Sequence, residues 1–253
     1  LTYAIVEGGN TTTASGNLGG TINIGNTTSL LPDGNDNNTI SFCDIRDRSD
    51  IVATPAMAIM SIGYNAGTLD QYNNNLTISN NNIHDWFLLN GTTQYGINVG
   101  VGASNYTING NSFYQTTSRT NTVTGAVTRA INISNTAPIN SNGGFIITGN
   151  FIGGTAPGAT GGDWVLGAAA LVSQTFSGIN VVSGLIPNTI SNNVVRKIDF
   201  TVYPTVAALV FNGILGGQGN HTFSGNTVGS NTGQDHIKVN IHTNAAVNSF
   251  FSG

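Results

Sequence analysis

Two short clusters of ionisable residues carry the chemistry that this sequence offers. Arg46 and Asp47 form the first, and His84 and Asp85 follow 38 residues further along. If the clusters occupy adjacent strands in register, their side chains lie about 5 Å apart. Two carboxylates at that distance can shift each other's pKa, bind Ca²⁺ or act as an acid–base pair. The catalytic candidates are therefore Asp47, Asp85, Arg46 and His84. The alternative is a set of solvated ion pairs, because further charges of both signs follow Asp47.

Metal-ligating residue types also lie near the C-terminal end. His236, Lys238, Asn240 and His242 alternate, which places them on one face of a strand. Two histidines at this spacing can hold a metal. We favour a solvated outer face, because no third ligand is obvious for this set of residues. We therefore expect no resident cofactor or metal, with Ca²⁺ as the one ion to test.

Aromatic residues fall in the segments between the repeated strands. Those that we predict as ligand contacts are Tyr64, Tyr72, Trp86, Tyr95, Tyr114 and Trp164. Aromatic planes among Asn, Thr and Gln suit glycans, because the apolar face of a sugar stacks while amides bond its hydroxyls. The alternative is that these rings only pack the loops.

A repeat along most of the chain must position all of these residues. Six copies follow the pattern Thr-apolar-small polar-(Gly/Asn)-Asn-x-apolar, at 39–45, 77–83, 107–113, 146–152, 189–195 and 222–228. Five copies carry Asn at the fifth position, namely Asn81, Asn111, Asn150, Asn193 and Asn226, and the first has Cys43 there. Stacked Asn side chains hydrogen-bond along their column. We therefore predict a structural Asn ladder and a small buried thiol at Cys43.

Period-two alternation follows each copy and completes the architecture. Residues 58–62, 96–101 and 130–133 alternate in this way, which indicates strands with one buried face. A short strand cannot bury its own face, but stacked coils can. The prediction is an all-β, right-handed parallel β-helix of about six to seven coils with loops of unequal length. One domain spans 1–253, with a repeat core over about 20–245, and we interpret it as a segment of a longer or processed protein.

The repeat resembles the right-handed parallel β-helix of the pectate-lyase-like superfamily. It looks most like the β-helix repeat regions of secreted Bacteroidota surface proteins, for which Gly-Asn-Phe-Ile-Gly-Gly at 149–154 and Gly-Asn-Thr-Val-Gly-Ser at 225–230 are typical. Such regions belong to large adhesins or surface proteins exported by the type IX system. The resemblance implies an extracellular or cell-surface location. The Asn-Thr-Asp, Asp-Asp, Gly-His-Gly and Arg-Ile-Lys elements of the polygalacturonase group are missing from this sequence.

Composition narrows the classes of function. Only 7% of the residues are charged, against about 25% in ordinary soluble domains. Long helices need charged residues such as Glu and Lys on their solvent-exposed faces. A chain with so few charged residues therefore does not fit a helical bundle or an α/β enzyme. A net charge of −4 argues against a nucleic-acid partner. No apolar run approaches the roughly 20 residues of a membrane span.

The sequence thus predicts a non-enzymatic extracellular or cell-surface β-helix, an adhesin- or stalk-like segment that binds glycans or other surface proteins. One alternative is a polysaccharide lyase or glycoside hydrolase acting through Asp47 and Asp85. Another is a self-stacking filament subunit, because uncapped solenoid ends expose strand edges. A third is ice binding by the outward Thr column that includes Thr39, Thr77 and Thr107. End-to-end stacking or continuation into further coils is expected for any of these functions.

Overall fold

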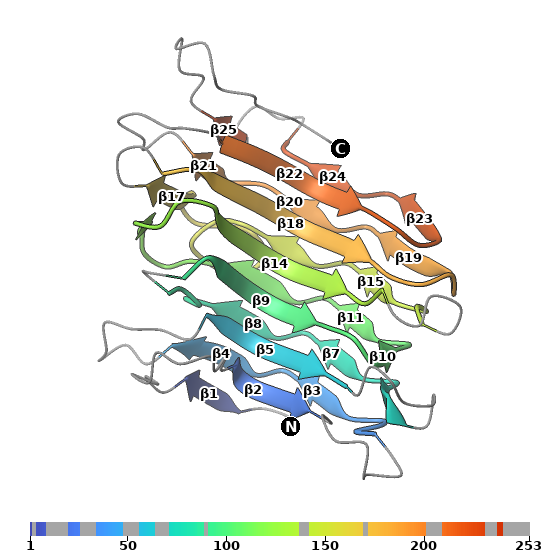
Figure 1. The fold of residues 1–253 in the computed structure, drawn as a ribbon. Helices are drawn as coiled ribbons and strands as arrows, with labels where there is room; N and C mark the ends of the chain where they lie inside the picture. Colours follow the sequence, from blue (N-terminus) through green and yellow to red (C-terminus); the bar gives the residue numbers. More distant parts are fainter. Residues whose placement is uncertain are drawn as a thin grey trace.

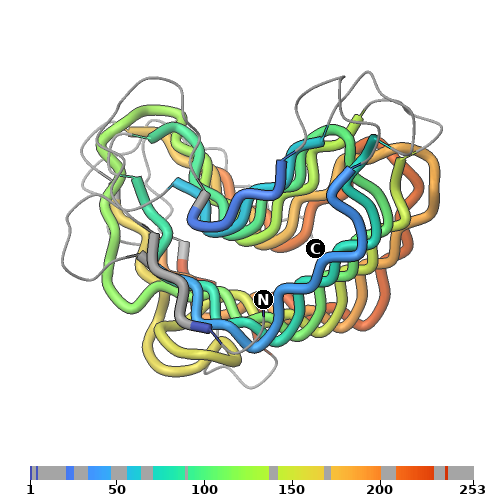
Figure 2. Tube along the Cα trace, turned by 90° about the horizontal axis from the view of Figure 1, so that it is seen from below, coloured from blue at the N-terminus to red at the C-terminus, as the bar shows by residue number. Residues whose placement is uncertain are grey.

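The repeat folds into short strands that stack in parallel, coil upon coil, in a computed structural model of the chain (Figure 1). The structure describes residues 1, 4–8, 20–25, 34–47, 56–63, 71–88, 91–136, 142–168, 172–200, 209–230 and 237–239. Every pairing between named strands is parallel, and each strand pairs with its equivalent one coil away. The coils superimpose when viewed along the stack (Figure 2). The predicted all-β parallel solenoid is therefore confirmed.

Three long sheets and two shorter ones make up the stack. The seven-stranded sheet contains β1 (Ile5–Gly8), β4 (Asp44–Asp47), β8 (Asn82–His84), β12 (Ser112–Tyr114), β16 (Phe151–Ile152), β20 (Val194–Val195) and β24 (Thr227–Val228). One six-stranded sheet contains β3 (Thr39–Ser41), β7 (Thr77–Ser79), β11 (Thr107–Asn109), β15 (Ile146–Thr148), β19 (Asn188–Ser191) and β23 (His221–Ser224). The other contains β2 (Gly20–Gly25), β5 (Met57–Ile62), β9 (Thr93–Val99), β14 (Ala126–Ser134), β18 (Gln174–Val182) and β22 (Leu209–Gly216).

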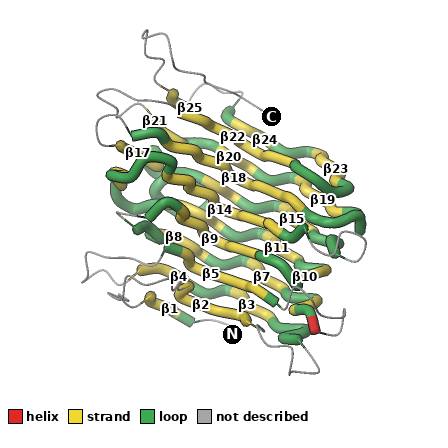
Figure 3. Tube along the Cα trace, viewed as in Figure 1, coloured by secondary structure: helices red, strands yellow, loops and turns green. Residues whose placement is uncertain are grey.

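The shorter sheets lie where the coils differ most in length. A four-stranded sheet contains β13 (Arg119–Asn121), β17 (Trp164–Ala168), β21 (Ile198–Phe200) and β25 (Ile237–Val239). A two-stranded sheet contains β6 (Asn73–Asn74) and β10 (Ala103–Ser104). Figure 3 shows how loops separate these strands along each coil.

The fourth position of the repeat makes the sharp turn between two sheets. Asn80 has φ 56°, Gly110 has φ 66° and Asn192 has φ 55° at this position. Asn and Gly tolerate positive φ better than other residues do. Phe42 takes the same position in the first copy with φ 56°, so the coil geometry imposes the turn even where the sequence resists it.

The apolar residues of the repeat form columns through the interior. Ile78, Ile108, Ile147 and Ile190 pair in register and are fully buried. Burying an Ile side chain stabilises the fold by about 1.5–3 kcal/mol. A single coil buries one such residue per column, so stability accumulates only through stacking.

The predicted Asn column forms a continuous ladder beside this core. Asn81 donates from its main-chain N–H and from Nδ2 to Oδ1 of Asn111, at 3.0 and 2.9 Å. Asn111 makes the same two bonds to Asn150, and the pattern continues through Asn193 to Asn226. At the start of the column, the main-chain N–H of Cys43 donates to Oδ1 of Asn81 at 2.9 Å. Cys43 is a free, buried thiol, as predicted.

Candidate functional site

The seven-stranded sheet positions the ionisable cluster on its outer face. Ile83 of β8 points into the core, so the neighbouring His84 faces outward. His84 pairs in register with Tyr114 of β12. On the other side, Ile45 of β4 pairs with Ile83, and this register places Arg46 beside His84. Arg46, His84 and Tyr114 therefore stand in one column across three coils.

His84 lies between two carboxylates. Its Nε2 is 2.7 Å from Oδ1 of Asp44, and its Nδ1 is 2.8 Å from Oδ2 of Asp85. The imidazole stacks on the Tyr114 ring, with centroids 4.5 Å apart and planes 10° apart. Only 7% of the His84 side chain is exposed. The ring is thus fixed by contacts on both nitrogens and one face.

Asp85 accepts hydrogen bonds from a neighbouring coil as well as from His84. The main-chain N–H of Thr116 donates to its Oδ1 at 2.9 Å, and the Thr116 hydroxyl donates to its Oδ2 at 2.8 Å. The Arg119 guanidinium lies 3.4 Å from the same carboxylate. Asp85 has φ 58° and is 6% exposed. It therefore anchors the loop after β12 to the end of β8.

The electrostatics of the cluster favour the charged forms of both central residues. Burial lowers the pKa of His84, but hydrogen bonds and charge from Asp85 and Asp44 outweigh burial and raise it above the ordinary value of 6.5. Burial raises the pKa of Asp85, but the hydrogen bonds of His84 and Thr116 outweigh it and lower the pKa below 3.8. Burial, and then the charges of Asp44 and Asp85, raises the pKa of Tyr114 to about 12.

These protonation states determine what the cluster can do chemically. An imidazolium that donates from both nitrogens has no lone pair with which to accept a proton. A carboxylate that accepts several donors holds a proton poorly, so it makes a weak general acid. The contacts of His84 and Asp85 therefore form an ionic clamp between coils when the imidazole is protonated.

The second carboxylate that reaches His84, besides Asp85, belongs to Asp44, which was not among the predicted site residues. Asp44 pairs with Asn82, two residues before His84, so it shares the outer face with the histidine. The main chain of Asp47 lies at the end of β4 and pairs with Gly8. Its side chain falls outside the described part of the chain, and its predicted pairing with Asp85 stays a prediction.

Sequence reasoning missed three members of the cluster. The alternation of strand residues was the available signal for Asp44, because it shares a face with Arg46. Thr116 and Arg119 come from a loop whose path no repeat pattern predicts. Arg46 lies 3.8 Å from Asp44 and completes the outer, more exposed side of the cluster.

Three predicted ligand-binding rings are buried, which corrects their assignment. Tyr72 and Trp164 are 0% exposed and Trp86 is 1% exposed. The two indoles meet edge to face, with ring centroids 5.3 Å apart. A sugar cannot stack on a ring whose faces are covered by protein, so these residues serve the core. These rings fill the interior between coils, because the short strands supply few other large apolar side chains.

The other predicted site residues differ in their exposure, and some lie outside the described part of the chain. Tyr114 is buried as well, at 6% exposed, because His84 covers one face of its ring, and its assignment as a ligand contact is likewise corrected. Tyr64, His236 and His242 lie outside the described residues. Only Tyr95 stands half-buried on an outer strand face, with the Arg129 guanidinium 5.6 Å from its ring centroid.

Tyr95 adjoins a polar row on the outer face of the sheet that contains β9, β14 and β18. Arg129 donates from Nη1 to Oδ1 of Asn132 at 2.6 Å. Asn132 donates from Nδ2 to Oδ1 of Asn98, and Asn180 donates to Oδ1 of Asn132, at 2.7 and 2.9 Å. Nε of Arg129 is a buried donor for which the described residues supply no acceptor. This row, Tyr95, Asn98, Arg129, Asn132 and Asn180, is named the polar row below.

Comparison with protein-family models, with curated proteins and with solved structures finds no match for this chain. Among the described residues, no three His, Cys, Asp or Glu side chains come together as metal ligands. Within the same part of the chain, no helix is long and apolar enough to cross a membrane.

Proposed function

We propose that the chain is a non-enzymatic β-helix segment of an extracellular or cell-surface protein, with an adhesin- or stalk-like role. The observation that carries this proposal is the saturation of the His84 cluster. Both nitrogens of His84 and both oxygens of Asp85 bind protein groups. Residues held in this way stiffen the junction between coils, which is the property that a spacer needs. Extracellular placement and Bacteroidota origin rest on the resemblance of the repeat.

Glycan contact belongs to the same proposal and is assigned to the polar row. Tyr95 offers a half-buried aromatic ring, and the Arg129 guanidinium lies beside it, 5.6 Å from the ring centroid. Sugars pair an apolar ring face with hydroxyl groups that accept and donate hydrogen bonds. Asn98, Asn132 and Asn180 are buried and repeat over three coils, so they hold this pair in place and do not contact a glycan themselves.

The test is retention of the purified chain on neutral and acidic polysaccharides, with and without Ca²⁺. We expect retention that Tyr95→Ala and Arg129→Gln each weaken several-fold. The control is Thr189→Ala, an exposed position on β19 of the other six-stranded sheet. Retention that neither row variant changes would remove the polar row from the proposal. Loss of retention without Ca²⁺ would indicate that Ca²⁺, the one ion that the sequence analysis leaves to be tested, takes part in binding.

A further inference from the structure

The Asn ladder ends on a residue whose donors lack an acceptor. In each link of the ladder, the main-chain N–H and Nδ2 of one Asn donate to a single oxygen, Oδ1 of the next Asn, at 3.0 Å and at 2.9 or 3.0 Å. Asn226 accepts this pair of bonds from Asn193, and its own Nδ2 donates to the Ile190 carbonyl at 2.8 Å. Among the described residues, nothing accepts from the main-chain N–H of Asn226 or from its second Nδ2 proton.

These two donors are arranged for one particular kind of partner group. The same two groups meet a single carboxamide oxygen in every earlier link, so Asn226 holds them ready for an oxygen in the same place. A partner that covers the donors without supplying an oxygen leaves two buried N–H groups unsatisfied, which is costly. The end of the ladder therefore selects a partner that carries an Asn side chain at this point.

The strands on either side of Asn226 supply the rest of a docking surface. β23 and β24 stand last in their sheets and, within the described ranges, pair only with β19 and β20. Phe223 is 46% exposed and Val228 is 37% exposed, whereas Ile190 and Val195, which precede them in the same columns, are 0% exposed. Strand edges with exposed apolar side chains take up a further strand through main-chain pairing.

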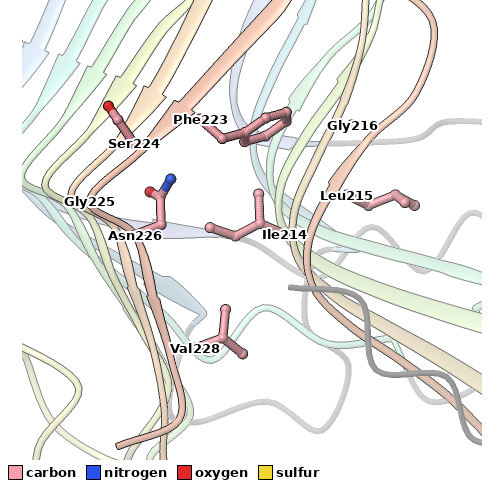
Figure 4. Close-up of a pocket in the computed structure, with 8 residues that line it drawn as sticks. All are labelled: Ile214, Leu215, Gly216, Phe223, Ser224, Gly225, Asn226 and Val228. Atoms are coloured by element: carbon pink, nitrogen blue, oxygen red, sulfur yellow. The ribbon is translucent and has the colours of Figure 1, made fainter.

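A hollow beside Asn226 leaves room for the side chains of such a strand. Ile214, Phe223, Asn226 and Val228 are among the residues that line it, and its volume is ≈ 640 Å³. Figure 4 shows the side chains of Ile214, Phe223 and Val228 around this space, with the amide of Asn226 at its edge. The partner must therefore combine an Asn with apolar neighbours, which is the pattern of the repeat itself.

A second copy of this chain does not present that pattern at its first described coil. Ile5 pairs with Asp44, so Ala4 stands beside Cys43 at the start of the Asn column. Neither Ala nor Cys has a side-chain oxygen. Head-to-tail stacking of two copies would leave both donors of Asn226 unpaired, which argues for a different partner.

We propose that the turn between β23 and β24 binds a strand–turn–strand segment of another polypeptide, with an Asn at its turn and apolar residues on both sides. The Asn of the partner places its Oδ1 on the two donors of Asn226. The strands of the partner lie parallel to β23 and β24, and their apolar side chains cover Phe223 and Val228. The Asn ladder of this chain then continues across the interface.

The probe that tests this site is a synthetic peptide that copies residues 106–114, with Asn111 at the ladder position. Titrated into the purified chain, it should shift the NMR resonances of Asn226 and Phe223. It should also slow amide hydrogen exchange at the Asn226 N–H by about tenfold or more, because that N–H gains an acceptor. No shift and no slowing at millimolar peptide would overturn the proposal.

Two variants of the peptide test the role of the Asn. Asn111→Leu is similar in size but has no oxygen, so it should bind about tenfold or more weakly. Asn109→Ala changes a side chain that faces away from the interior in the native coil and should bind like the parent peptide. Equal weakening by the two substitutions would contradict the assigned contact.

Substitutions in the protein test the same contact from the other side. Asn226→Asp keeps an acceptor for Asn193, but it removes the Nδ2 donor and repels an incoming oxygen. Phe223→Ser changes an exposed side chain, so it keeps the test informative if Asn226→Asp destabilises the fold. Both should weaken peptide binding by about tenfold or more, and Thr222→Ala, exposed on β23, should leave it unchanged.

Sedimentation of the native chain distinguishes the remaining occupant, a second copy. We expect no self-association that depends on Asn226. Dimers or filaments that form with the native chain and disappear with Asn226→Asp would show that a second copy occupies the site, which contradicts the proposal. These readouts need no glycan, so they do not depend on the function proposed above.

Discussion

His84 couples the stability of the middle coils to pH, because two carboxylates hold it in its charged form. Its folded pKa is raised above the unfolded value of 6.5. The stabilisation is therefore fully present below pH 6.5 and is lost as pH rises through the raised pKa. Asp85 acts in the opposite direction, since its pKa is lowered from 3.8. Its contribution is present above pH 3.8 and is lost as pH falls through the lowered pKa.

The first prediction follows from this pH dependence. The free energy of unfolding, measured in urea, should fall as pH rises above about 6.5. His84→Gln should flatten the fall, because Gln carries no charge at any pH. His221→Gln is the control, since His221 lies on β23, away from the cluster. An unchanged slope in His84→Gln would contradict the proposed pairing.

The second prediction concerns the partner that the sequence did not reveal. Asp44→Asn should lower the pKa of His84, read from its ring resonances by NMR titration, because a neutral amide replaces a charged acceptor at 2.7 Å. Asp163→Asn should leave that pKa unchanged, because Asp163 pairs with Lys238. If Asp44→Asn leaves the pKa of His84 unchanged, the contact with Asp44 contributes little to that pKa.

At this scale the sequence predicted the column but not the contacts. Arg46, His84 and Tyr114 could be aligned because each follows the fifth position of the repeat by three residues. Thr116 and Arg119 could not be, because they come from a loop whose path depends on packing rather than on a repeat. The spacing of the repeat therefore predicts which residues are neighbours on adjacent strands, but it does not predict partners that come from loops.

At the scale of the element, the Asn ladder links one coil to the next. Asn111 is fully buried and bonds Asn81, Asn150 and the carbonyl of Ile78. One residue type recurring at one position made the ladder predictable. The aromatic rings were not predictable in the same way, because Trp86 and Trp164 follow no repeated spacing and their burial depends on contacts across three coils.

The third prediction tests the ladder. Asn111→Ala leaves the buried N–H of Asn81 without its acceptor, at a cost of about 1–3 kcal/mol per unsatisfied group. Urea unfolding should show a clear loss of stability. Asn109→Ala, two residues earlier and exposed, is the control and should change stability by less than about 0.5 kcal/mol. Equal losses would mean that the ladder contributes no more than an exposed side chain does.

At the scale of the whole molecule, the repeat dictates a parallel stack whose stability grows with every coil. The outward Thr column has Thr39, Thr77 and Thr107 in register, and Ile146 interrupts it before Thr189. Ice binding and self-stacking into filaments stay predictions. The parallel fold was predictable because spacing and alternation recur.

The most direct test of the non-enzymatic proposal is an assay for new chain ends. The purified protein is incubated with neutral and acidic polysaccharides, with and without Ca²⁺, and both reducing and unsaturated ends are measured. We predict no increase in ends above the buffer blank, even on polysaccharides that retain the protein. New ends that appear with the native chain and disappear with Asp85→Asn or Asp47→Asn would contradict this account and identify a polysaccharide-cleaving enzyme.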